Sequence, residues 1–306
     1  MITFDEQVAI VTGAGHGLGR SHALGLAERG ARVVVNDLGG ARDGTGSSTT
    51  AAEQVVAEIE AAGGEAIANT GDVTDQDAVK SMVDEAVEQW GRVDILINNA
   101  GALRDKSFSN MSIEDFAFVV DVHLMGTAIC TKAVWGHMRD QSYGRIVVTT
   151  SSSGLYGNFG QANYGAAKLG VVGLMNTLRA EGEKYNIKVN ALAPVAHTRM
   201  TDELLPDEAK ALLRPEEVTP GVLVLVSKDA PNGMILTAGA GGYGAARIYE
   251  TAGIWFSPNQ RTPENIAERL DEILASDEQQ ELKSGNEQTM KFLRQASGAS
   301  TDENVT

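Results

Sequence analysis

The sequence predicts an α/β protein built on a doubly wound, seven-stranded parallel sheet, with a C-terminal helical extension. Three observations lead to this fold class: short β-branched runs recur along the chain, helical patterns alternate with them, and the chain turns polar beyond about residue 250. Runs that are apolar throughout, rather than alternating in and out, are typical of parallel strands covered by helices on both faces. Strands and helices in alternation therefore predict a doubly wound sheet.

The predicted elements follow one another in the order that such a sheet requires. The strands are VAIVT at 8–12, RVVVN at 32–36, EAIAN at 65–69, VDILIN at 93–98, RIVVTT at 145–150, IKVNALA at 187–193 and MILTA at 234–238. The stretch at 38–50 is so polar and rich in glycine that we expect a long loop. After residue 250 the pattern predicts two polar helices up to about 295. We therefore expect a dinucleotide-binding domain at 1–249 and a helical extension at 250–306.

Composition narrows the class of protein. The chain has 306 residues, enough for one full-sized α/β core with an appendage, and its net charge of −16 would repel a phosphate backbone, so we expect no nucleic-acid partner. Cys130, the single cysteine, excludes an internal disulfide framework and fits a reducing compartment. No uninterrupted apolar run reaches the ~20 residues of a membrane span, and MITFDEQ lacks a basic secretory signature. We expect a cytoplasmic protein without a membrane partner.

A glycine-rich turn, TGAGHGLGR, follows the first predicted strand. Glycines let the backbone approach a pyrophosphate, and the N-terminus of the following helix offers free N–H groups, which predicts cofactor contacts by Gly13, Gly15, Gly17, Leu18 and Gly19. A tight strand-to-helix connection would also explain the glycines. The second strand, however, ends in Asp37, whose carboxylate can bind ribose hydroxyls and would repel a 2′-phosphate. The pattern is Rossmann-like and favours NAD over NADP, although His16 and Arg20 are nearby basic groups that could weaken the preference.

Two further segments follow strands and are predicted to lie at the same edge of the sheet. GDV at 71–73 places Asp72 and Val73 where they could hold the adenine, and NNAG at 98–101 could pass under the ribose with Asn99, Ala100 and Gly101. Each alone is more often turn chemistry. Because both segments follow strands of the same sheet, in the order that a cofactor site requires, together they favour cofactor binding.

Tyr164 and Lys168 lie one helical turn apart in NYGAAKL. On one helix face the ammonium can stabilise a phenolate and lower the tyrosine pKa, so that the tyrosine can exchange a proton with an alcohol or carbonyl oxygen. Ser151, at the end of the fifth strand, could donate a hydrogen bond to the same oxygen. Taken alone, such a Tyr-Lys pair is usually a surface feature.

Together TGAGHGLG, NNAG, Ser151 and the Tyr164 to Lys168 motif resemble the short-chain dehydrogenase/reductase superfamily, over about residues 5–245. The resemblance implies a seven-stranded parallel sheet and nicotinamide chemistry, and no metal site is expected. It implies that Tyr164 is the acid/base, that Lys168 binds the ribose and modifies the tyrosine pKa, and that Ser151 orients the substrate. It also implies cofactor contacts by Tyr164 and Lys168 themselves and by Pro194, Val195 and Thr198, although Pro-Val stands where Pro-Gly is usual.

A narrower resemblance is carried by VVVNDLGG, NNAGALRDKSF, YGNFGQANYGAAKLG and GAGGYGAARIYET. These stretches are similar to the (3R)-hydroxyacyl-CoA dehydrogenase portion of peroxisomal multifunctional enzymes of type 2. In that group the extension helps to cover the active site, often across a dimer interface. His123 stands where many superfamily members carry asparagine, and it is either a catalytic proton relay or a residue packed in a helix.

The leading hypothesis is therefore the NAD-dependent interconversion of a 3-hydroxyacyl-CoA and a 3-oxoacyl-CoA. A hydroxysteroid dehydrogenase or a 3-oxoacyl carrier-protein reductase is the enzyme alternative, and a non-catalytic NAD-binding sensor is the alternative from another class. Small residues on the Tyr164 helix favour a homodimer or homotetramer. An apolar stripe in the extension is expected to cover the substrate site, and four cations are candidates for a CoA phosphate: Arg104, Lys106, Arg199 and Arg247.

Overall fold

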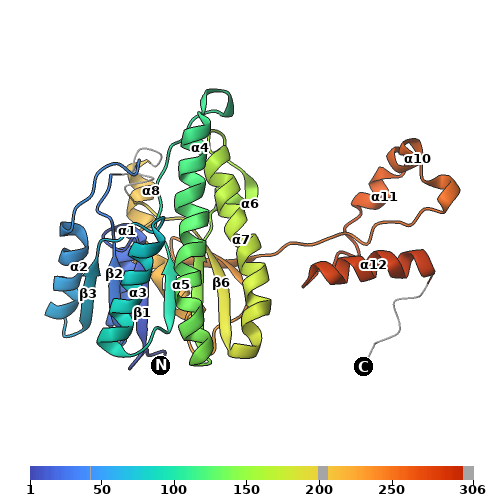
Figure 1. Cartoon of the computed structure of the whole chain (residues 1–306). Helices are drawn as coiled ribbons and strands as arrows, with labels where there is room; N and C mark the ends of the chain where they lie inside the picture. The colour runs from blue at the N-terminus through green and yellow to red at the C-terminus, as the bar shows by residue number, and fades with distance from the viewer. Residues whose placement is uncertain (42, 199–205, 299–306) are drawn as a thin grey trace. The chain divides into compact units, whose positions relative to one another are not determined.

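The protein is described here by a computed structural model, which places residues 1–41, 43–198 and 206–298. The chain divides into two compact units, Met1–Ala245 and Ala246–Thr306. The first unit contains the sheet and the helices on both of its faces (Figure 1).

The sheet has the strand order β3-β2-β1-β4-β5-β6-β7-β8. Its strands are β1 Val8–Thr12, β2 Arg32–Asn36, β3 Glu65–Asn69, β4 Ile95–Asn98, β5 Gly144–Thr149, β6 Ile187–Pro194, β7 Ile235–Gly239 and β8 Gly242–Ala246. The pairs from β3 to β7 are parallel, so the predicted doubly wound α/β fold is confirmed. The chain leaves β1 toward β2 on one side and β4 lies on the other, which makes the carboxyl end of β1 the topological switch point where such sheets bind ligands.

The eighth strand was not among the seven expected. Ala240 and Gly241 both have positive φ values, 48° and 73°, and two such residues form the tight turn that joins β7 to a following strand. β8 has no β-branched residue and is largely exposed, so it lacks the buried apolar pattern that identified the central strands. Tyr243 of β8 instead donates a hydrogen bond from Oη to the Glu217 carbonyl at 2.7 Å.

Helices α3, α5 and α7 cover one face of the sheet, and α1, α2 and α9 cover the other (Figure 1). The helices of the first unit are α1 Gly17–Ala27, α2 Thr50–Ala61, α3 Gln76–Trp90, α4 Ile113–Val120, α5 Gly126–Asp140, α6 Ser152–Tyr156, α7 Ala162–Gly182, α8 Asp207–Leu212 and α9 Thr219–Leu225. Short 3-10 turns are η1 Phe108–Asn110, η3 Glu183–Tyr185 and η5 Pro215–Glu217. The central strands are buried on both faces, as their continuous apolar runs predicted.

A π-helical segment, η2 Asp121–Met125, joins α4 to α5 and makes one long helix. By length and composition this helix, Ile113–Asp140, could cross a membrane, with a mean hydropathy of 1.4. A core helix passes the same test, and Cys130, Val134 and Met138 are indeed buried in the first unit.

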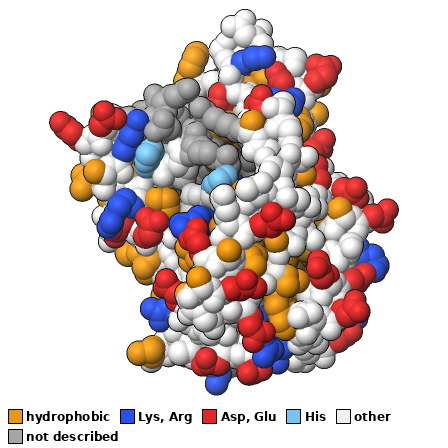
Figure 2. All heavy atoms as spheres, turned by 90° about the vertical axis from the view of Figure 1, so that its left-hand side faces the viewer, with side chains coloured by type: hydrophobic (Ala, Val, Ile, Leu, Met, Phe, Trp, Pro, Cys, Tyr) orange, Lys and Arg blue, Asp and Glu red, His pale blue; other side chains and the backbone are white. Residues whose placement is uncertain are grey.

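On the face shown in Figure 2, Lys and Arg side chains are scattered among acidic ones.

The second unit is polar and held mainly by hydrogen bonds and ion pairs. It contains η6 Pro258–Gln260, α10 Pro263–Glu268, α11 Leu270–Leu274 and α12 Gly285–Ser297. The two predicted helices are thus three, because the backbone leaves helical geometry at Arg269. Lys291 binds the Glu250 carboxylate at 2.7 Å, and none of the described residues of this unit is fully buried. The expected apolar stripe remains exposed at Trp255, Ile266, Leu270 and Leu274.

Candidate active site

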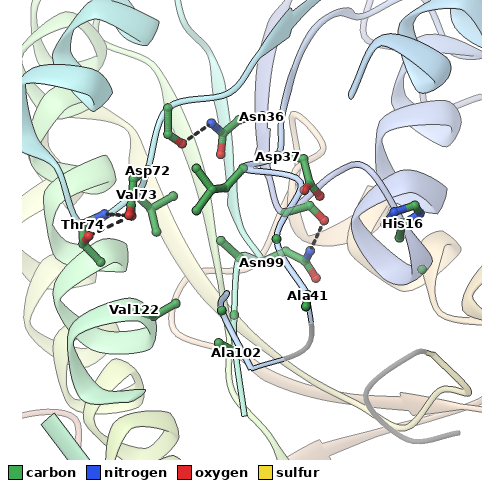
Figure 3. A pocket seen from close by; sticks show the side chains of 18 of the residues that line it. His16, Asn36, Asp37, Ala41, Asp72, Val73, Thr74, Asn99, Ala102 and Val122 are labelled. Carbon is green, nitrogen blue, oxygen red and sulfur yellow. Dashed lines mark hydrogen bonds between the residues drawn. The ribbon is translucent and has the colours of Figure 1, made fainter. Parts of the chain in front are cut away.

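A cavity of about 260 Å³ opens at the carboxyl ends of β1, β2 and β4 (Figure 3). Most of the predicted cofactor residues line it together: Gly13, Gly17, Leu18, Asp37, Asp72, Val73, Asn99, Ala100, Gly101 and Thr198. Two predicted glycines do not. A side chain at Gly15 would meet the Asp37 carboxylate at 2.8 Å, and one at Gly19 would collide with the Gly13 carbonyl, so these two positions allow tight packing behind the turn.

Asp37 directly follows β2 and is 9% exposed. Its Oδ2 accepts a hydrogen bond from the Gly15 amide and its Oδ1 accepts one from the Gly39 amide, both at 2.7 Å. These two bonds use half of the roughly four lone-pair sites of a carboxylate. The carboxylate is therefore held in one orientation and can still accept bonds from ribose hydroxyls.

Asn99 fastens the end of β4 to the glycine turn. Its Nδ2 donates to the Thr12 carbonyl at 3.1 Å and to the Gly13 carbonyl at 3.0 Å. The amides of Asn99 and Ala100 both donate to Thr12 Oγ1. NNAG thus shapes the cavity through its side chains and backbone, and its predicted turn role and cofactor role are compatible.

The end of the cavity next to β3 is lined by an Asx turn (Figure 3). Asp72 Oδ1 accepts from the amide and the hydroxyl of Thr74, both at 2.8 Å, while Val73 adds a buried apolar wall. Asn36, which was not predicted, donates to Asn69 Oδ1 and to the Gly71 carbonyl and so joins β2 to this turn. The glycine cradle, the fixed carboxylate and the apolar wall fit a dinucleotide.

Tyr164 lies in the first turn of α7. The buried Asn163 accepts a hydrogen bond from the Tyr164 amide at 2.8 Å, and Ser151, the N-cap of α6, is hydrogen-bonded to the Tyr164 side chain. Burial raises the pKa of Tyr164, the bond with Ser151 lowers it, and the Asp105 carboxylate raises it. The expected net lowering of the tyrosine pKa is therefore wrong for the protein's own groups, because desolvation of the phenolate outweighs the hydrogen bond.

Lys168 is 4% exposed and donates a hydrogen bond from Nζ to the Thr149 carbonyl at 2.7 Å. The ammonium lies 5.5 Å from the centre of the Tyr164 ring. Burial lowers the pKa of Lys168 to about 7, so its charge is only partly retained at neutral pH. Lys168 is not among the groups that shift the pKa of Tyr164, which are burial, Ser151 and Asp105.

His123 lies in the π-helical segment η2 and is 2% exposed. Its Nε2 is 2.8 Å from the Ala102 carbonyl, and its ring meets Tyr164 edge-on with centroids 5.0 Å apart. Burial and the nearby Lys168 hold the pKa of His123 well below its ordinary value, so the imidazole is neutral. Nδ1 is buried, and none of the residues that the structure places forms a hydrogen bond with it. A side chain at Gly101 would collide with this ring, so Gly101 also makes room for His123.

Of the remaining predicted residues that the structure describes, none lines the cavity. Pro194 ends β6, and the Val195 amide donates to the Ala238 carbonyl at 2.8 Å, which joins this turn to β7. The cations proposed for a CoA phosphate are paired where they are described: Arg104 and Lys106 with Asp115, and Arg247 with Glu281. Arg199 lies outside the described residues. Among the residues that the structure places, no group of three or more His, Cys, Asp or Glu could hold a metal ion.

Sequence reasoning missed part of the cavity wall. Leu38, Gly40, Ala41 and Gly44 of the 38–50 loop line it, as do Ala102, Phe118 and Val122. The loop's glycines directly after Asp37 were a usable signal, since they permit close approach to a ligand. Phe118 and Val122 lie on the long helix and had no local signal.

The sequence of this chain is similar to those of known short-chain dehydrogenases. The short chain dehydrogenase family profile matches residues 7–209. A short-chain type dehydrogenase/reductase of Mycobacterium tuberculosis is 49% identical over 88% of this chain and 94% of its own length. The mouse peroxisomal multifunctional enzyme type 2 is 49% identical over 89% of this chain, which spans only 37% of that enzyme.

Two solved structures extend the comparison. Full-length peroxisomal multifunctional enzyme type 2 from Drosophila melanogaster matches with a TM-score of 0.82 and 35% identity, over 98% of this chain and 51% of that one. A 7α-hydroxysteroid dehydrogenase complexed with NADH and a 7-oxo bile acid matches with a TM-score of 0.71 and 30% identity, over 78% of this chain and 95% of that one. The chain therefore belongs to the short-chain dehydrogenase family of oxidoreductases, whose cofactor is a nicotinamide nucleotide.

Proposed function

We propose that the protein is an NAD-dependent oxidoreductase that interconverts a 3-hydroxyacyl-CoA and a 3-oxoacyl-CoA. The observation that carries the chemistry is the Tyr164 side chain, hydrogen-bonded to Ser151 and in edge contact with His123. His123 in turn binds Ala102, which lines the cofactor cavity. The similarity to peroxisomal multifunctional enzymes supports the substrate class.

In this proposal the side chains of the protein transfer the proton, and the oxidised nicotinamide, when bound, would supply the hydride acceptor. Tyr164 takes the substrate hydroxyl proton during oxidation and returns it during reduction. Ser151 donates to the same substrate oxygen and orients it. Because burial raises the pKa of Tyr164, the protein by itself stabilises the protonated phenol, which is the form that donates a proton in the reductive direction.

Asp37 supports the choice of NAD. Its fixed carboxylate would repel a 2′-phosphate and can accept bonds from the ribose hydroxyls. Asp72 and Val73 complete the adenine end in this proposal, and Thr198 lines the same cavity beside Gly17.

Two other substrates have specific support. The 3-oxoacyl-[acyl-carrier-protein] reductase of Synechocystis is 41% identical over 75% of this chain and 93% of its own length. The hydroxysteroid dehydrogenase structure supports a sterol-like substrate. A panel of 3-hydroxyacyl-CoA, 3-oxoacyl carrier-protein and hydroxysteroid substrates, followed at the nicotinamide absorbance band, separates the three. Turnover of none of them, with retained NAD binding, would favour the non-catalytic sensor.

We further propose that the extension covers the acyl site and that the protein acts in the cytoplasm as a homodimer or homotetramer. The exposed apolar side chains of the extension, such as Trp255 and Leu274, need a partner surface, and the small residues of α7 permit close helix approach. Deleting residues 250–306 should raise the Michaelis constant for thioesters far more than the dissociation constant for NAD. A folded, truncated protein with normal thioester kinetics would rule the cover out, and sedimentation equilibrium tests the assembly.

A further inference from the structure

The arm Asp43–Ser48 of the loop after β2 forms part of the cavity wall. Gly44 and Phe118 both line the cavity and lie next to each other: Gly44 has a positive φ of 81°, and a side chain there would collide with the Phe118 ring. The arm is ordered by its own turn, in which Asp43 Oδ1 accepts from the amide of Thr45 at 3.0 Å and from its hydroxyl at 2.7 Å. The Ser48 amide donates back to the Leu38 carbonyl at 3.0 Å.

The Arg104 side chain joins the arm to helix α4, which packs beside it. Its guanidinium stacks on the Phe118 ring of α4 at 3.6 Å from the centroid and donates from Nε to the Asp43 carbonyl at 3.3 Å. Asp115 binds its Nη1 at 3.2 Å and orients the fork. A planar guanidinium can stack on a ring and at the same time donate hydrogen bonds from its edge, a combination that the ammonium of lysine does not offer.

The backbone of Arg104 reaches the catalytic helix. Asn163, buried at the start of α7, donates from Nδ2 to the Arg104 carbonyl at 3.1 Å and accepts the Tyr164 amide. Arg104 thus contacts the cofactor wall through its side chain and the Tyr164 segment through its main chain.

We infer that Arg104 is a positioning residue for the dinucleotide: it holds the arm Asp43–Ser48 against Phe118 and ties this wall to the segment that carries Tyr164. Arg104 does not line the cavity, so it acts through the wall and not by touching the cofactor. The inference rests on the proposed nicotinamide site and assigns Arg104 a role other than CoA binding.

Lys106 provides a matched control. It shares the Asp115 carboxylate with Arg104, at 3.0 Å, but its side chain is 52% exposed, and within the part of the chain that the structure describes it pairs with Asp115 rather than with Phe118 or the arm. Replacing either residue by alanine removes one positive charge beside Asp115. Only Arg104→Ala removes the stacking contact and the bond to the arm.

The experiment measures NADH binding by fluorescence titration and NADH release by stopped-flow displacement, without substrate. Loss of one stacked cation and one hydrogen bond predicts a roughly tenfold weaker dissociation constant for Arg104→Ala, mostly from faster release. Lys106→Ala should change it less than about twofold. Hydrogen exchange of the Asp43–Ser48 amides should accelerate in Arg104→Ala only.

A second variant perturbs the same cavity wall by changing a residue of the arm itself. Gly44→Ala leaves Arg104 in place but pushes the arm from Phe118, and it should weaken NADH binding in the same direction. If Arg104→Ala binds NADH as Lys106→Ala does, or if a folded Gly44→Ala variant binds it normally, the positioning role is refuted while the proposed function stands. If the wild-type protein binds neither NADH nor NADPH, both the inference and the proposed function fail.

Discussion

Replacing Lys168 with methionine should abolish turnover and at the same time stabilise the fold. Lys168 is 4% exposed, and burial lowers its pKa from 10.5 to about 7. A shift of this size corresponds to roughly 4 kcal/mol of destabilisation at pH 7, because the unfolded chain keeps the charged form that burial disfavours. Methionine matches the length of the lysine stem and needs no hydration.

The gain is reduced by the bond that the substitution removes. Lys168 Nζ donates to the Thr149 carbonyl at 2.7 Å, and a charged hydrogen bond contributes about 1.5–3 kcal/mol. The expected net stabilisation is therefore about 2 kcal/mol at pH 7, or a rise in melting temperature on the order of 5 °C for a chain of this size.

The sign of the pH dependence gives a second check on Lys168. Since the folded-state pKa is lower than the unfolded one, the unfolded chain binds more protons between pH 7 and 10.5, and wild-type stability should rise with pH across this window. The difference between Lys168→Met and wild type should shrink over the same window. Denaturant titration at several pH values, with activity measured on the same samples, tests both claims. A Lys168→Met protein that is less stable than wild type at pH 7 would refute the reasoning.

Three further outcomes are expected. Tyr164→Phe should lower kcat by roughly 10²–10⁴ while the dissociation constant of NADH changes little, because only the transferable proton is lost; retention of more than about a tenth of wild-type turnover would point to another acid. Asp37→Ser should reduce the ratio of kcat/KM for NAD over NADP, since the carboxylate that faces a 2′-phosphate is gone, and an unchanged ratio contradicts the ribose assignment. The pKa of His22, fully buried beside Thr219, is lowered to about 3, so stability should fall as pH drops below 6.5 toward about 3, where the unfolded chain binds the extra proton. Urea denaturation of wild type and His22→Asn between pH 7 and 4 checks this, and equal pH slopes would exclude His22 as the source.

The sequence alone was sufficient to predict an element or a site wherever the residues of a single segment form a recognisable pattern. The central strands β1, β4 and β5 were recognisable because each is a short run buried on both faces, and such runs have no polar face to confuse them with surface helices. Glycines before a helix, and Asp37 at a strand end, indicated a nucleotide cavity because those residue types are needed for close backbone approach and for ribose hydroxyls. β8 was not predicted because its residues are exposed and because a tight turn, rather than an apolar pattern, defines where it begins.

Only the tertiary structure decided how these residues influence one another. The spacing of Tyr164 and Lys168 placed them on one helix face, but their pKa values depend on burial, which the sheet, α4 and η2 impose from distant parts of the chain. The sequence indicated Arg104 only as a candidate cation for a CoA phosphate. Its contacts with Phe118, Asp43 and Asp115 join segments whose proximity no local pattern encodes. Residue type and period are local properties, whereas desolvation and the pairing of charges depend on which segments the fold brings together.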